Sequence, residues 1–183
     1  MRVLHLGSGR KGQTLETEGD VEIVTLDADA RLNPNLVCTL GQQNIPLPDD
    51  SVDVAIAVHV LEHIGRQGDV TEWFYFWEDL YRVLIPDGQC HFESPWYNSV
   101  WAWGDPSHTR VLSPESFLFF SQDSYRIPES PISPYRINCD FICNAEFKVN
   151  VDPRLKERES ITGFSGTLIA RKPLKPWWTD TLI

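Results

Sequence analysis

The stretch VLHLGSGRKG, residues 3–12, decides how the rest of the chain is interpreted. An apolar run leads into glycines at positions 7, 9 and 12, the G-x-G-x-x-G spacing of a dinucleotide-binding strand, turn and helix. That interpretation needs a helix directly after the third glycine, because the helix N-terminus holds the pyrophosphate. Only QTLETEG separates Gly12 from the next strand candidate, near Val21. We therefore predict a truncated or absent helix here, which counts against an NAD site.

A carboxylate at the end of the next strand candidate favours a different nucleotide-like ligand. Asp27 lies 20 residues after Gly7 and ends the run VEIVTLD, residues 21–27. At that position it can accept hydrogen bonds from both vicinal hydroxyls of a ribose. The strand, the glycine turn and the acid together predict an adenosine cofactor without requiring a pyrophosphate. The alternative is a glycine turn and a capped strand that bind nothing.

Strand and helix candidates alternate through the first half of the chain. Apolar runs predict strands over residues 2–6, 21–27, 35–40, 52–58 and 89–94. Residues 70–84 predict a helix that Pro86-Asp87-Gly88 ends. Its apolar stripe consists of Trp73, Trp77, Leu80, Tyr81 and Leu84. Strands joined by such crossovers indicate a parallel sheet in an α/β sandwich.

The second half of the sequence is richer in turns and aromatic residues. Residues 95–110 predict a long aromatic loop. Ser113 as the N-cap and Pro114 at the first position predict a helix over residues 113–121. Residues 135–151 and 163–173 predict a closing antiparallel strand pair.

Length, charge and cysteine content exclude several classes of protein. The 183 residues predict one domain, residues 1–173, with a C-terminal tail over residues 174–183. A net charge of −10 argues against a broad nucleic-acid surface. No apolar run approaches the roughly 18 residues of a membrane span. Because no Cys-x-x-Cys pair occurs, we expect reduced thiols in a cytoplasmic protein and no metal site. The four cysteines are Cys38, Cys90, Cys139 and Cys143.

Three further segments carry a resemblance to a known family. IPLPDDSVDVAIAVHVLEHI (45–64), DLYRVLIPDGQCHFESP (79–95) and DPSHTRVLSPESF (105–117) resemble class I S-adenosylmethionine-dependent methyltransferases. They are most similar to small bacterial and phage members with LPxPD and VLEH segments. The resemblance spans about residues 2–120 in consistent order. It implies a Rossmann-like three-layer sandwich with a mostly parallel seven-stranded sheet and an antiparallel C-terminal hairpin. The helices that precede the first strand in the family are expected to be absent.

The resemblance also implies which residues bind the cofactor, S-adenosyl-L-methionine. Asp27 would bind the ribose hydroxyls, and His59 would lie beneath the methyl group. The other implied cofactor-binding residues are Leu6, Gly7, Ser8 and Gly9 along the methionine and ribose, and Ala28 and Asn44 near the adenine. The chain departs from the family pattern at His5 and Thr39, where family members commonly have acids.

Three histidines are candidates for catalysis in such an enzyme. A base is needed when the acceptor hydroxyl or amine must lose a proton. The candidates are His59, His63 and His108, with Glu62 as a fourth and Asp105 as an orienting carboxylate. For each of them a structural role is the alternative.

The acceptor and the partners are less constrained by the sequence. We predict methyl transfer to a small-molecule or saccharide-type acceptor. The aromatic cluster Trp96, Tyr97, Trp101 and Trp103 either binds that acceptor or fills the core. The alternative function is a degenerate methyltransferase-fold protein that serves as a binding or scaffold subunit. A second copy or another partner could then cover the edge of the sheet where the cofactor binds.

Overall fold

The computed structural model describes residues 1–9, 19–130, 132–148 and 163–179. The strands are β1 (Arg2–Leu6), β2 (Glu22–Asp27), β3 (Leu36–Val37), β4 (Val52–Val58), β5 (Leu84–Pro95), β6 (Phe141–Lys148) and β7 (Gly163–Ala170). The α-helices are α1 (Thr71–Val83), α2 (Val100–Gly104) and α3 (Gln122–Arg126). Short 3-10 helices span Ala30–Leu32, Leu61–His63, Pro114–Phe120 and Trp177–Thr179.

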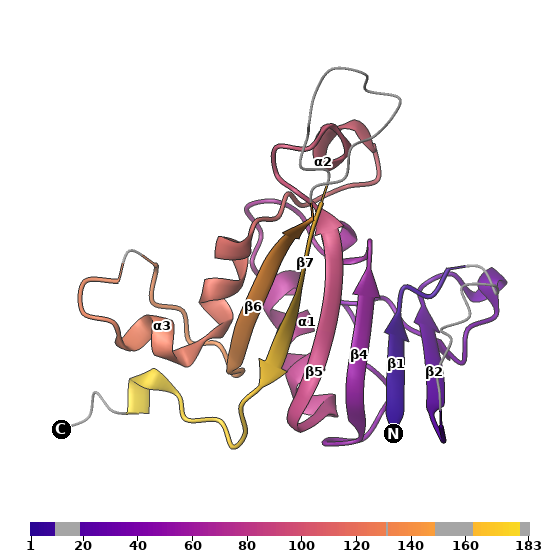
Figure 1. The fold of residues 1–183 in the computed structure, drawn as a ribbon, viewed down its shortest axis with the longest axis horizontal. Coiled ribbons are helices and arrows are strands. Elements are labelled where there is room, and N and C mark those ends of the chain that lie inside the picture. Colours follow the sequence, from indigo (N-terminus) through magenta and orange to yellow (C-terminus); the bar gives the residue numbers. More distant parts are fainter. Residues whose placement is uncertain (10–18, 131, 149–162, 180–183) are drawn as a thin grey trace.

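The described strands form one seven-stranded sheet in the order β3-β2-β1-β4-β5-β7-β6 (Figure 1). Neighbouring strands pair in parallel except β7, which is antiparallel to both β5 and β6. This arrangement confirms the predicted fold class, a mostly parallel Rossmann-like sheet with an antiparallel C-terminal hairpin. The carboxyl ends of β1, β2 and β4 lie together at one edge, where ligands bind in open α/β sheets.

The core lies between the sheet and α1. Trp73, Trp77 and Leu80 of the predicted stripe are buried on the inner face of this helix. The Trp77 ring is fully buried and packs edge-on against Phe117 and Phe141, which come from the second half of the chain. This aromatic contact ties the C-terminal segments to the α1 layer.

The opposite face of the sheet has no described helix lying over it (Figure 1). Side chains alternate along a strand, so Ala55 and Ala57 of β4 face the core while Val58 points away from it. Val58 on β4 and Ile142 on β6 are 41% and 40% exposed. Parallel sheets are ordinarily covered on both faces, whereas this face combines the exposed Val58 and Ile142 with polar side chains such as His91 and Thr167.

The structure corrects several predicted boundaries. The strand expected over 35–40 is only Leu36–Val37, because the chain turns toward the core at the buried Cys38. The helix expected over 113–121 is a 3-10 helix over Pro114–Phe120, although its capping box at Ser113 is present. The expected loop over 95–110 contains the short helix α2.

The helix stop is also in a different place. Helix α1 ends at Val83, and β5 begins at Leu84 rather than at residue 89. Leu84 pairs with Val52 and Gln89 with Val54, so the residues between them bulge out of the ladder. Asp87, in that bulge, has a φ of +62°. The Pro-Asp-Gly run therefore shapes a strand irregularity instead of ending the helix.

The C-terminal tail docks through its first tryptophan. The backbone N–H of Trp177 donates to Gln122 Oε1 at 2.9 Å, and its indole N–H donates to the carbonyl of Tyr135 at 3.1 Å. The indole also stacks on Tyr125. None of the described helices is long and apolar enough to cross a membrane.

Candidate functional site

The glycine turn after β1 is joined directly to the acid after β2. The N–H of Gly9 donates to Asp27 Oδ2 at 3.0 Å, and the N–H of Asp29 donates to Oδ1 at 2.9 Å. Gly7 and Gly9 have φ values of +56° and +62°, the left-handed region that favours glycine. A Cβ on Gly7 would lie 2.4 Å from Val60 Cγ2, so the turn after β1 packs closely on the segment after β4.

A pocket of about 290 Å³ opens beside this junction. Of the sequence-predicted cofactor residues, it brings together Gly7, Asp27, Ala28 and His59. Leu26, Leu40 and Ile64 supply apolar walls. The remaining lining residues are Cys38, Thr39, Val60 and His63. The pocket thus combines one carboxylate and two histidines with a mainly apolar wall.

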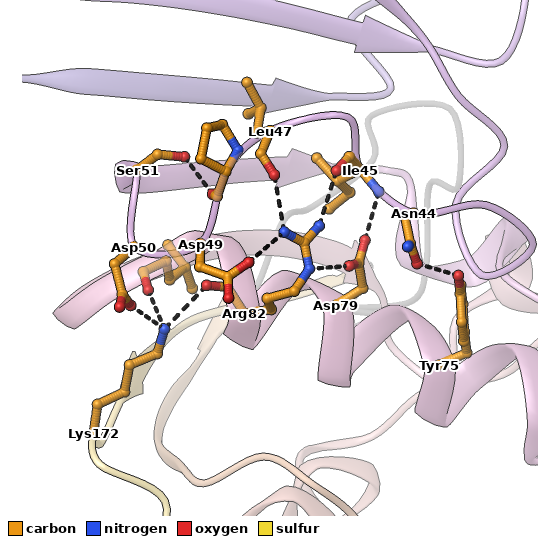
Figure 2. A network of polar contacts seen from close by, with 12 residues as sticks. Asn44, Ile45, Leu47, Asp49, Asp50, Ser51, Tyr75, Asp79, Arg82 and Lys172 are labelled. Atoms are coloured by element: carbon orange, nitrogen blue, oxygen red, sulfur yellow. Dashed lines mark hydrogen bonds and ion pairs between the residues drawn. The ribbon is translucent and has the colours of Figure 1, made fainter.

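Four predicted cofactor residues do not line this pocket. Leu6 is fully buried under the turn, and Ser8 is buried with its N–H bonded to the carbonyl of Leu26. Gly9 contributes through its bond to Asp27. Asn44 is exposed and accepts a hydrogen bond from the Tyr75 hydroxyl on α1 (Figure 2). The side chain of Asn44 thus points to α1, while its carbonyl accepts from the thiol of the pocket-lining Cys38 at 3.6 Å. The predicted absence of a long helix after Gly12 lies outside the described residues.

His5 is buried in β1 at 4% exposure, between β2 and β4. Burial lowers the pKa of its imidazole, although the negative charge of Asp27 opposes that shift. A buried neutral imidazole thus stands where an acid was expected from the resemblance. It cannot supply the negative charge that an acid at this position would supply.

A cluster of titratable side chains lies where β4 and β5 end, and Glu62 is at its centre. Glu62 is only 2% exposed. Its Oε1 lies 3.2 Å from His59 Nδ1, and its Oε2 accepts a hydrogen bond from the Ser94 hydroxyl at 3.1 Å. His59 Nε2 lies 3.9 Å from Glu93 Oε1. This pairing orients the imidazole of His59 at the rim of the pocket.

The other two predicted histidines belong to the same cluster. The rings of His63 and His108 meet edge to face with centroids 4.9 Å apart. His108 Nε2 lies 3.9 Å from Glu62 Oε1 and 3.8 Å from Asp105 Oδ2. His63 Nδ1 lies 3.1 Å from the carbonyl of Ser107. All the predicted catalytic candidates therefore lie together, although they come from two distant parts of the sequence.

The aromatic loop is mostly exposed. Trp101 and Trp103 are 44% and 73% exposed, and Tyr97 is 49% exposed. Trp96 is half-buried and contacts Phe164 of β7. Of the two alternatives, filling the core applies to Trp96 and is wrong for the other three. A second concave region of about 480 Å³ is lined by Trp96, Tyr97, Val111, Leu112, Ser113 and Glu115.

An ionic network that the sequence did not identify holds the loop before β4 (Figure 2). Arg82 on α1 donates to Asp79 Oδ1 at 2.7 Å and to the carbonyls of Ile45 and Leu47, each at 2.9 Å. Asp79 Oδ2 accepts from the N–H of Ile45 at 2.5 Å. Lys172, after β7, donates to Asp50 in the same loop. The sequence signal was an acid and an arginine three residues apart on the predicted helix, which the structure places against the loop over residues 45–50.

Comparisons with known proteins agree with this geometry. Residues 4–92 match the family model described as "Methyltransferase domain". No curated protein matches the sequence significantly.

Solved structures provide the wider comparison. A SAM-dependent methyltransferase from Archaeoglobus fulgidus is 18% identical with a TM-score of 0.57, over 93% of this chain and 86% of that one. A structure of the Haloferax volcanii Trm112 methyltransferase activator in complex with the putative methyltransferase gives 13% identity and a TM-score of 0.57. The match covers 93% of this chain and 82% of that one. The DhpI–SAH complex is 14% identical in sequence, with a TM-score of 0.54, and the match covers 94% of this chain and 78% of that one. Residues 4–92 of this chain thus match the methyltransferase domain family, and the chain has the fold of S-adenosylmethionine-dependent methyltransferases.

Proposed function

We propose that this protein is an S-adenosylmethionine-dependent methyltransferase that acts on a small-molecule or saccharide-type acceptor. One observation carries the proposal: Gly7, Asp27 and His59 converge on one pocket at the carboxyl ends of β1, β2 and β4. The family match and the fold neighbours support S-adenosylmethionine as the cofactor.

The residues of the pocket fit this cofactor. Asp27 accepts one backbone N–H on each oxygen, which leaves a lone pair on each for the two ribose hydroxyls. The apolar side chains of Leu26, Leu40 and Ile64 suit an adenine ring. Among the described residues, no atom lies within 4 Å of the place that a Cβ on Gly9 would take. The residues after β1 would hold the methionine portion there.

Catalysis would depend mainly on positioning. When bound, S-adenosylmethionine supplies a methyl group already activated on a sulfonium, so proximity and orientation provide much of the rate. His59 would take the proton of the acceptor hydroxyl at Nε2 while its Nδ1–H donates to Glu62. Glu62 is a positioning residue, because it does not itself line the pocket and its buried carboxylate fixes the imidazole tautomer of His59, which does.

The aromatic loop supports a flat, partly apolar acceptor. Trp96 follows Glu93 by three residues, so the concave region that it lines with Tyr97 lies beyond the same end of β5 as the histidine cluster. Exposed aromatic rings bind the apolar faces of sugars, and Ser113 and Glu115 add polar groups for hydroxyls. This combination of groups favours the saccharide-type acceptor.

A second candidate, a binding subunit with little or no catalysis, is favoured by the uncovered face of the sheet. A shallow groove of about 550 Å³ runs across β4, β5, β7 and β6 on that face. Its lining residues are Ile56, Val58, His91, Phe92, Glu93, Asn144, Glu146, Ser165, Gly166 and Thr167. A second copy or another protein docked there would cover the exposed Val58.

Titration calorimetry separates the two candidates. We expect S-adenosylmethionine and S-adenosylhomocysteine to bind with micromolar affinity, and NAD, as the matched adenosine control, not to bind. If the folded protein binds none of the three compounds, the proposal of an enzyme is contradicted and the proposal of a binding subunit remains. NAD binding at the same affinity would instead restore the dinucleotide interpretation of the glycine turn.

A further inference from the structure

We propose that Glu62, His63 and His108 form a binding site for one divalent transition-metal ion of the zinc type. Each residue offers one ligand atom, and these three atoms lie within 4.8 Å of one another. Two imidazoles and a carboxylate form a donor set that zinc takes in proteins. The site lies at the rim of the proposed cofactor pocket, because His63 lines that pocket.

The separations within the cluster are too long for direct hydrogen bonds. His108 Nε2 lies 3.9 Å from Glu62 Oε1 and 3.8 Å from Asp105 Oδ2, whereas an N–H···O bond measures roughly 2.7–3.2 Å. A zinc ion is bound at roughly 2.0–2.2 Å from nitrogen and oxygen ligands, so two ligands of one tetrahedral ion lie roughly 3.3–3.6 Å apart, and the 3.9 Å between Glu62 and His108 would shorten by a few tenths of an ångström on binding. The observed spacing therefore leaves room for an ion between these groups.

The hydrogen bond of His63 prepares its other nitrogen as a ligand. Its Nδ1 lies 3.1 Å from the carbonyl oxygen of Ser107, which can only accept, so Nδ1 carries the proton. In a neutral imidazole Nε2 then has the lone pair. A metal-binding histidine typically donates its other N–H to a backbone carbonyl or a carboxylate in this way.

His108 provides a second, independent indication. Its side chain is nine-tenths buried, and its Nδ1 is a buried polar atom without a hydrogen-bond partner among the described residues. A buried polar nitrogen that lacks a partner costs free energy unless another interaction of the ring offsets it. Coordination of an ion by Nε2, which faces the carboxylates of Glu62 and Asp105, would offset that cost within the ring, although it would leave Nδ1 itself without the partner that His63 has.

The backbone holds the two halves of the site together. The carbonyl of Glu62 accepts the N–H groups of Thr109 and Arg110, each at 3.0 Å, directly after His108 in the sequence. The Arg110 guanidinium donates to the carbonyls of Ile64, Arg66 and Asp69. The loop that carries His108 is thus fastened to the turn that carries Glu62 and His63, which prepares the ligands before an ion arrives.

The metal would have a role in methyl transfer, and this step rests on the proposed function. Three protein ligands leave a fourth position open, as in catalytic zinc sites. An acceptor hydroxyl bound there would lose its proton more readily, because the cation stabilises the alkoxide. His59, outside the ligand set and bonded to Glu62, would accept that proton at Nε2. The O–H bond would break with its proton on His59, and the acceptor oxygen would use the freed electron pair to bond the methyl carbon while the S–CH3 bond breaks and its electron pair stays on the sulfur of S-adenosylhomocysteine.

The test measures metal binding without the cofactor. Protein stripped with a chelator is titrated with Zn²⁺ by calorimetry and with Co²⁺ by visible absorption. We expect one ion per chain and the absorption bands of a four-coordinate Co²⁺ site. His63→Gln and His108→Gln should each weaken metal binding by at least roughly tenfold, because even substitution of a residue that only hydrogen-bonds to a metal ligand lowers metal affinity by that much. His91→Gln, a histidine on the uncovered sheet face, is the matched control and should bind like the unaltered protein.

Histidine NMR on the unaltered protein tests the same site without depending on variants that fail to fold. Zn²⁺ should shift the ring signals of His63 and His108 and leave those of His91 in place. No binding by the unaltered protein, or shifts confined to His91, would overturn the proposal. Calorimetry with S-adenosylhomocysteine on the same metal-free sample is a separate measurement, so a missing metal site and a missing cofactor site give different results.

Discussion

Asp79→Ala is expected to lower the free energy of unfolding by about 2–4 kcal/mol, because it removes the buried carboxylate of a half-exposed ion pair and leaves the N–H of Ile45 without its acceptor. Asp79 is 7% exposed and bonds both the Arg82 guanidinium and the N–H of Ile45. Without it, the N–H of Ile45 and part of the guanidinium lose their partner (Figure 2). The loop before β4 would lose its attachment to α1.

Urea unfolding followed by circular dichroism measures this effect. Asp49→Ala is the matched control, because Asp49 also bonds Arg82 but has a side chain that is 74% exposed. We expect at most about 1 kcal/mol for that exposed pair. Equal losses in both variants would show that burial of Asp79 contributes nothing, contrary to the network described here.

Asp27→Ala is expected to weaken the binding of S-adenosylhomocysteine by about 1–3 kcal/mol, or roughly 5- to 150-fold. The substitution removes a charged acceptor for the ribose hydroxyls. It also removes the bond that holds Gly9 beside the end of β2. Both losses act on the cofactor side of the pocket, so affinity should fall more than stability does.

Titration calorimetry compares the affinity of Asp27→Ala for S-adenosylhomocysteine with that of Asp29→Ala, the matched control. Asp29 lies two residues further on and binds Arg31 at the surface, while only its backbone N–H contacts Asp27. Its alanine variant should bind the cofactor product like the unaltered protein. An unchanged affinity for Asp27→Ala, with a correct fold by circular dichroism, would remove Asp27 from the site.

The fold was predictable because its signals are local. The apolar stripe from Trp73 to Leu84 has helical spacing, and the first two strand runs end at Gly7 and Asp27. Boundaries failed where tertiary contacts override local preference. Pro86-Asp87-Gly88 resembles a helix stop, yet pairing of Leu84 with Val52 draws the chain into β5 first.

The site was predictable only in part. Gly7, Asp27 and His59 could be placed because parallel strands end at one edge of the sheet. The convergence of loops predicts that His108 lies near Glu62, but it does not predict the distance between them. The two residues are 46 positions apart in the sequence, and a hydrogen bond from the N–H of Thr109 to the carbonyl of Glu62 brings them together. Asn44 does not line the pocket, because its side chain turns toward Tyr75 on α1, and its predicted place near the adenine stays a prediction.

The most direct test of the account is the histidine NMR spectrum of the unaltered protein titrated with S-adenosylhomocysteine. The chain has five histidines, of which His59 and His63 line the proposed cofactor pocket and His91 lines the groove on the uncovered face. We predict saturable shifts of the ring signals of His59 and His63, with His91 unchanged. Saturable binding that shifts His91 alone, or that leaves all five signals in place, would contradict the account.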